Sequence, residues 1–186
     1  MRIIVYGVGA IGGTVAAALT LAGQEVAGIA RGKMLEAIRA DGLRLRTTEF
    51  DKRVTFPVYA DPSEVRFTVD DVILLTMKGQ DTVPALEALR AAGVTEQPIF
   101  CLQNGIDNER SALRLFPNVY AVMVAMPADY VTAGEVVCYG TPKLGMLDIG
   151  RYPAGTDATA NRLAGALDGA GFKSFLLDDV MASKRG

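Results

Sequence analysis

The chain has 186 residues, half of them hydrophobic, and its 19 basic and 21 acidic residues leave a formal net charge of −2. This balance argues against a nucleic-acid partner and a polybasic membrane-binding role, and we expect a cytoplasmic protein with no signal peptide or membrane span. Two cysteines, Cys101 and Cys138, are too few for a disulfide framework. Because histidine is absent, Ser-His-Asp chemistry, histidine metal sites and a His–Asp proton relay are excluded. We expect no metal site.

The first residues predict a phosphate-binding turn. The apolar run 3–5 is followed by Gly7, Gly9 and Gly12 at the spacing G-x-G-x-x-G, and residues 14–21 have the small apolar character of a helix. Gly7 permits a tight turn, Gly9 lets a pyrophosphate approach the backbone, and Gly12 lets the helix pack close to the strand. N–H groups at the helix start then face the phosphates. The predicted cofactor-binding residues of this turn are Gly7, Val8, Gly9, Ala10, Ile11 and Gly12. A glycine-rich turn that binds no ligand is the alternative.

Apolar runs then alternate with amphipathic stretches, which predicts a Rossmann-type, doubly wound and mainly parallel α/β sheet. Further strands are expected at residues 25–29, 71–76, 98–102 and 119–126, helices at 35–40, 82–92 and 108–115, and a hairpin or two short strands at 43–47 and 53–59.

The pattern changes near Tyr130. Segments 134–139 and 143–149 predict a β-hairpin, followed by an amphipathic helix over 156–169 and a final strand over 174–177. Asp178 and Asp179 are typical caps of a last helix. We expect residues 1–178 to form one NADP-binding domain and residues 179–186 to begin the helix that leads to a further domain.

The end of the second strand predicts the choice of dinucleotide. In NAD-binding versions of this fold a carboxylate there holds the ribose hydroxyls. The segment Ile29-Ala30-Arg31-Gly32-Lys33 has no carboxylate. The planar guanidinium of Arg31 suits a 2′-phosphate, and Lys33 is near it in sequence. The sequence therefore favours NADPH over NADH, with a solvated surface arginine as the alternative.

Polar residues follow two other predicted strands. Lys78 comes after 72–77, and Gln103-Asn104-Gly105 comes after 99–102. Ligands of open α/β sheets lie outside the carboxyl ends of the strands, so we expect Lys78 and Asn104 to face the crevice of the glycine turn and to contact cofactor and substrate. A surface lysine and an ordinary Asn-Gly turn are the alternatives.

Together these residues resemble the ketopantoate reductase (2-dehydropantoate 2-reductase) family. The match comprises the three glycines, Arg31, Thr76-Met77-Lys78, Gln103-Asn104-Gly105 and a later segment from Gly134-Glu135-Val136 to Ile149-Gly150. The resemblance implies NADPH-dependent reduction of a small 2-oxo acid, with 2-dehydropantoate as the default substrate in pantothenate biosynthesis. It also implies a helical second domain after this point. The oligomeric state stays open, with a homodimer as one alternative.

The resemblance further implies a catalytic lysine in a pattern like Lys-Leu-x-x-Asn. Lys184 is one candidate, and a lysine beyond Gly186 is the other, because Arg185-Gly186 does not continue that pattern. Two rival functions stay open: another two-domain NADP-dependent hydroxyacid dehydrogenase, and a non-enzymatic nucleotide-sensing module. Arg31 argues against the second rival, which usually has an acidic residue at that strand end.

Overall fold

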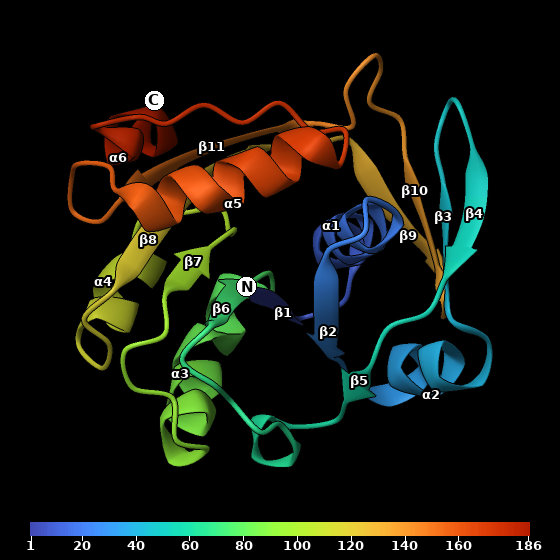
Figure 1. Ribbon diagram of the computed structural model, residues 1–186, viewed down its shortest axis with the longest axis horizontal. Helices are drawn as coiled ribbons and strands as arrows, with labels where there is room; N and C mark the ends of the chain where they lie inside the picture. The colour runs from blue at the N-terminus through green and yellow to red at the C-terminus, as the bar shows by residue number, and fades with distance from the viewer.

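The protein is built around a seven-stranded sheet with helices on both faces. A computed structural model describes residues 1–186 (Figure 1). The strand order is β11-β8-β7-β6-β1-β2-β5, and only the β11–β8 pair is antiparallel. The strands are β1 (Arg2–Tyr6), β2 (Glu25–Ile29), β5 (Val58–Tyr59), β6 (Asp71–Leu75), β7 (Ile99–Cys101), β8 (Val119–Ala125) and β11 (Met146–Arg151). The predicted fold class, α/β with a mainly parallel sheet, is confirmed.

Alternate residues of the central strands enter two separate cores. Ile3 and Val5 of β1 pack in the cluster that contains buried residues of helices α1 (Ala10–Leu21) and α5 (Ala158–Gly169). Ile4 faces the other side, in the cluster that includes residues of α3 (Thr82–Ala91) and α4 (Asn108–Leu113). A strand covered on both faces has no polar face, which is why β1 and β6 are continuous apolar runs.

A second sheet of four strands lies beside α1. Its order is β4-β3-β10-β9, with β3 (Leu43–Arg46), β4 (Asp51–Val54), β9 (Ala128–Thr132) and β10 (Glu135–Cys138). The strands β3, β9 and β10 contact α1, which therefore lies between the two sheets (Figure 1). The remaining elements are α2 (Gly32–Asp41), α6 (Val180–Arg185) and the short helices η1 (Pro62–Glu64) and η2 (Gly79–Asp81).

The predicted hairpin of 134–139 and 143–149 is wrong. Both segments contain strands, but β10 pairs with β9 and β3, whereas β11 pairs with β8 in the other sheet. Between them the chain crosses from one sheet to the other, and the Leu144 N–H donates to the Gly171 carbonyl at 2.9 Å. Alternating polarity indicates which face of a strand is buried, but it does not indicate the partner strand.

Two other strand predictions need correction. The run 53–59 is divided between β4 and β5, which lie in different sheets on either side of Pro57, a residue with no N–H to donate. The expected strand 174–177 forms only an isolated bridge to β11, between Leu176 and Ile149, and Lys173 just before it forms another with Met146. The predicted last helix is confirmed as α6, with the Asp179 carboxylate accepting from the Ala182 N–H.

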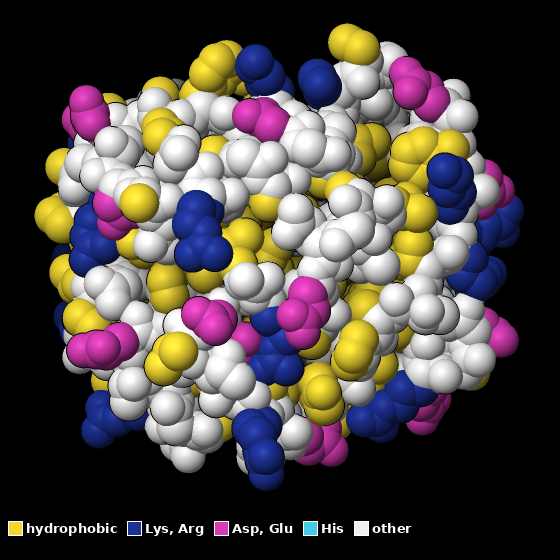
Figure 2. All heavy atoms as spheres, viewed as in Figure 1, with side chains coloured by type: hydrophobic (Ala, Val, Ile, Leu, Met, Phe, Trp, Pro, Cys, Tyr) yellow, Lys and Arg dark blue, Asp and Glu magenta, His cyan; other side chains and the backbone are white.

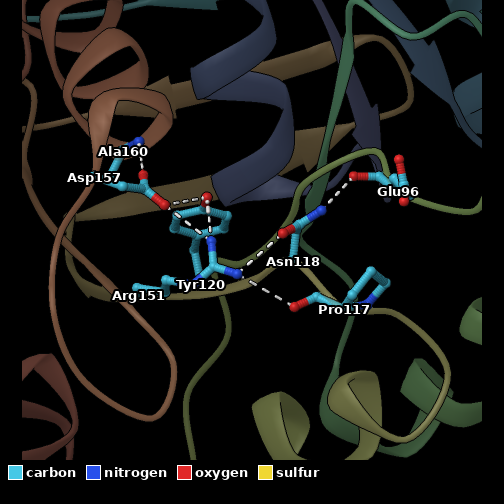
Figure 3. Close-up of polar contacts among 7 residues, drawn as sticks. All are labelled: Glu96, Pro117, Asn118, Tyr120, Arg151, Asp157 and Ala160. Carbon is cyan, nitrogen blue, oxygen red and sulfur yellow. Dashed lines mark hydrogen bonds and ion pairs between the residues drawn. The ribbon is translucent and has the colours of Figure 1, made fainter.

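A polar cluster joins the sheet to α5 at the amino-terminal ends of the parallel strands (Figure 3). The Arg151 guanidinium donates to the Tyr120 hydroxyl at 2.8 Å and to the Asp157 carboxylate at 2.9 Å. Asp157 also caps α5 by accepting from the Ala160 N–H. Burial and the Asp157 carboxylate raise the pKa of Tyr120 to about 12. The polar groups of these side chains are hydrogen-bonded to one another. The cluster lies at the end of the parallel strands that is opposite the glycine turn.

Charges of both signs are spread over the surface. On the face drawn in Figure 2, Lys and Arg side chains are interspersed with Asp and Glu side chains. Exposed pairs such as Arg44 with Asp51 at 2.8 Å and Arg110 with Asp107 at 3.0 Å bring opposite charges together. On the face drawn in Figure 2, no large patch of a single sign is visible.

Candidate functional site

Two glycines of the turn between β1 and α1 are required by the conformation and packing of the protein's own backbone. Gly7 has φ of +107°, and a Cβ there would lie 2.8 Å from the Met77 nitrogen. A Cβ on Gly12 would overlap the Gly7 carbonyl oxygen, which accepts a hydrogen bond from the Thr76 hydroxyl. Gly12 therefore lets α1 begin directly against the turn, and Thr76 at the end of β6 fixes that turn.

Gly9 differs from the other two glycines. A Cβ on it would meet no protein atom within 4 Å, and its backbone does not have the positive φ that favours glycine. Gly9 is the residue before α1, whose first turn has neither an acidic residue nor a side-chain cap. The first N–H groups of α1 thus point outward beside an open surface, which is the arrangement that binds phosphate at a helix start.

A cavity of about 790 Å³ opens at this turn. Its wall is formed by the start of α1, the end of β2, the segment after β5 and the loop from β6 to α3. The lining includes Tyr6, Gly7, Val8, Gly9, Ala10, Ile11, Ile29, Ala30, Arg31, Met34, Ala60, Asp61, Thr76, Met77, Lys78, Gln80, Asp81, Pro84, Ala85 and Ala88. A largely apolar cavity with a few charged groups has the character of a cofactor site.

The structure brings most of the predicted site residues together. Gly7 to Ile11, Arg31 and Lys78 all line the cavity, while Gly12 packs behind the turn. Asn104 does not line it, contrary to our expectation of a shared crevice: its side chain is exposed on the β7–α4 loop. The functional roles of these residues stay predictions.

The charged groups at the cavity include two carboxylates that the sequence did not single out. Arg31, whose side chain is 86% exposed, lies 3.4 Å from the Asp81 carboxylate. The Asp61 carboxylate accepts from the Ser63 N–H, which lowers the pKa of Asp61. Burial raises the pKa of Tyr6, a change that Asp61 enhances and Arg31 opposes. Arg31 therefore shares the wall of the cavity with acidic residues from two other segments.

A buried chain of side-chain hydrogen bonds connects the two loops that carry Lys78 and Asn104. The Gln103 amide donates to the Met77 carbonyl at 2.9 Å and to the Thr82 hydroxyl at 2.8 Å. Thr82 donates to the Asn108 amide oxygen, and the Asn108 amide donates to the Asn104 carbonyl. The Gln-Asn-Gly motif pointed to a functional Asn104. It did not indicate that the buried Gln103 side chain connects the loop of Lys78 to the loop of Asn104.

Lys184 lies in a buried ion pair. Its side chain is 3% exposed, and its ammonium group contacts both carboxylate oxygens of Glu109, whose side chain is fully buried, at 3.1 and 3.2 Å. It also lies 3.5 Å from the Cys101 carbonyl oxygen. Lys184 does not line the large cavity. The pair joins α6 to α4, two elements that are far apart in sequence.

Comparison with known proteins identifies the family. The family model described as "Ketopantoate reductase PanE/ApbA" matches residues 3–153. The chain belongs to the ketopantoate reductase family. The family comprises NAD(P)-dependent oxidoreductases, as the resemblance of the motifs implied.

Several curated relatives of this ketopantoate reductase family member are 2-dehydropantoate 2-reductases. The relative from Mesorhizobium japonicum is 36% identical over 107 residues, which cover 57% of this chain and 32% of that protein. The relative from Archaeoglobus fulgidus is 29% identical over 181 residues, which cover 96% of this chain and 57% of that protein. The chain thus spans at most about three fifths of these relatives.

Solved structures of the ketopantoate reductase family and of another dehydrogenase have the same fold. The PanE/ApbA family ketopantoate reductase from Ralstonia eutropha has a TM-score of 0.87 at 30% identity, covering 98% of this chain and 58% of that one. D-mandelate dehydrogenase with NADH and anilino(oxo)acetate has a TM-score of 0.87 at 25% identity, covering 99% of this chain and 60% of that one. None of the helices in the present chain combines the length and apolar character needed to cross a membrane.

Proposed function

We propose that this chain is the cofactor-binding part of an NADPH-dependent reductase that acts on a small 2-oxo acid, 2-dehydropantoate above all. The observation that carries the proposal is the pairing of an open phosphate site at Gly9 with Arg31 on the wall of the same cavity. Since β2 ends without a carboxylate, Arg31 is the residue placed to take the 2′-phosphate.

In this proposal, residues of the cavity and of the neighbouring loop hold different parts of the cofactor and the substrate. The first N–H groups of α1 hold the pyrophosphate, and Arg31 holds the 2′-phosphate by charge-assisted hydrogen bonds. Lys78, exposed at the end of β6, places a positive charge beside the cofactor and an anionic substrate. Asn104 presents an amide from the neighbouring loop, which Gln103 and Asn108 hold in place. The reduced nicotinamide supplies a hydride when bound.

Reduction of a ketone also needs a proton donor for the developing alkoxide. A positioned lysine suits this role in a chain without histidine. The Lys184 ammonium is paired with Glu109 and would have to leave it to reach the cavity. This favours the other candidate, a lysine beyond Gly186, as the acid. In that case Lys184 holds α6 in place through its ion pair with Glu109.

Turnover is the test of the proposed function. The second domain of the relatives is needed to hold ketone, acid and cofactor together, because losing such positioning costs several kcal/mol of barrier. We expect this chain alone to bind NADPH and to reduce 2-dehydropantoate very slowly, and the chain extended by a second domain of the kind that its relatives have to turn over substrate, measured by loss of reduced-nicotinamide absorbance. Equal rates for both proteins, or no NADPH binding by either, would contradict the proposal.

Replacement of Arg31 by alanine tests the choice of cofactor. The variant is expected to lose about 1–3 kcal/mol of NADPH binding free energy while NADH binding stays nearly unchanged, because only NADPH has the 2′-phosphate. Nucleotide fluorescence titrations with both cofactors measure the difference. Arg39→Ala is the control, since Arg39 is an exposed arginine of α2 outside the cavity lining. Equal loss for NADPH and NADH would place the 2′-phosphate elsewhere.

A second candidate keeps the reaction type and exchanges the cofactor. A structural neighbour at 25% identity, D-mandelate dehydrogenase, is titled with NADH. In the present chain Asp61 and Asp81 both line the cavity, and a carboxylate there could accept from ribose hydroxyls. Wild-type affinity for NADH equal to or above that for NADPH would favour this candidate.

A further inference from the structure

The carboxylate of Asp81 has one side-chain partner, and that partner is Arg31. Asp81 precedes α3, yet its side chain makes no capping hydrogen bond. Its contact is with the Arg31 guanidinium at 3.4 Å, and both residues line the cavity. Asp61, the other acidic residue of the lining, is already engaged by the Ser63 N–H. Of the two acidic residues in the lining, Asp81 is therefore the one in contact with Arg31.

The Arg31–Asp81 pair spans the glycine turn. Arg31 follows β2 and Asp81 lies in the loop after β6, and these are the two strands that flank β1 in the sheet. The two charges thus meet near the carboxyl end of β1, beside the glycine turn that follows it. With an arginine side chain that is 86% exposed, the pair is weak and easily opened.

We propose that Asp81 is a specificity-determining residue that competes with the 2′-phosphate for Arg31. The inference rests on the proposed function. When NADPH binds, Arg31 must exchange the Asp81 carboxylate for the phosphate, and the two anions then lie near each other. NADH carries no 2′-phosphate, so its binding involves no such exchange.

The balance of charge at the cavity supports this assignment. Its lining has two basic residues, Arg31 and Lys78, against the two acidic residues Asp61 and Asp81. An incoming phosphate therefore meets a cavity of no net formal charge. Removing the charge of Asp81 alone leaves an excess positive charge beside the site, without altering the residue's size.

The test is Asp81→Asn, with 2′,5′-ADP and 5′-AMP as probes that differ only in the 2′-phosphate. We expect 2′,5′-ADP and NADPH to bind roughly three- to tenfold more tightly to the variant, as for charges a few ångströms apart in water, with 5′-AMP and NADH nearly unchanged. The gain is expected to shrink at high salt. Asp51→Asn is the matched control, because Asp51 is also an exposed partner of an arginine but does not line the cavity.

The Arg31→Ala background completes the experiment. If Asp81 acts through Arg31, Asp81→Asn has a clearly smaller effect there. An unchanged 2′,5′-ADP affinity in Asp81→Asn, or the same gain with and without Arg31, would overturn the inference. Failure of the proposed function would give a different result. The wild-type protein would then bind 2′,5′-ADP no better than 5′-AMP, and the Asp81→Asn variant would not change this.

Discussion

Replacing Lys184 with methionine is expected to lower the free energy of unfolding by about 3 kcal/mol, because it leaves the buried Glu109 carboxylate without its partner. For a chain of this size the melting temperature should fall by roughly 6–12 °C. The double variant Lys184→Met/Glu109→Leu should recover much of the loss, since it removes both charges at once. Lys143→Met, at an exposed lysine, is the control and should change little.

The loss in Lys184→Met should depend on pH. Burial raises the pKa of Glu109, and Lys184 opposes that increase. Without Lys184 the pKa of Glu109 rises further, so the folded variant holds a proton that the unfolded chain releases above the ordinary carboxyl pKa. The variant should therefore be most stable below that pKa and lose stability as pH rises toward neutrality. Thermal melts at mildly acidic and at neutral pH that showed the same deficit would contradict the assignment of a buried pair.

Replacing Gly9 with valine is expected to abolish nucleotide binding and to leave the fold intact. A Cβ at Gly9 meets no protein atom within 4 Å and the backbone there does not require glycine, so the substitution should not disturb the packing of the protein itself. The pyrophosphate does not, because in this account it lies against the backbone at Gly9. Calorimetric titration with NADPH and a thermal melt, run on the same sample, measure the two effects separately.

Gly165→Val is the matched control for this substitution. Gly165 of α5 also has open space where a Cβ would lie, and it does not line the cavity. It should keep both stability and NADPH binding. Normal NADPH binding by Gly9→Val would show that the phosphates lie somewhere other than the glycine turn.

Local sequence features predicted the five strands β1, β2, β6, β7 and β8 because each of them is recognisable on its own. The strands β1 and β6 are short apolar runs, and the glycine spacing after β1 marks the turn into α1. The placement of β10 and β11 depends instead on which distant strands they meet. β9, which is largely exposed, has no run of buried residues by which to recognise it.

The site divides in the same way. The glycine turn and Arg31 follow from the order of residues within one βαβ unit, so the sequence could place them. Asp81 contacts Arg31 from 50 residues away, and Glu109 contacts Lys184 from 75 residues away. No local pattern marks such pairs. Lys184 could thus be proposed as an acid from its position near a family motif, whereas the structure shows it in an ion pair.

A crystal structure of this chain with NADPH is the measurement that tests the central claim most directly. Our account predicts the pyrophosphate against the N–H groups at the start of α1, beside Gly9, and the 2′-phosphate within hydrogen-bond distance of the Arg31 guanidinium. The same structure should show the Arg31–Asp81 pair opened. A nucleotide bound with its pyrophosphate away from the glycine turn, or with Arg31 still on Asp81 and the 2′-phosphate in solvent, would contradict the account.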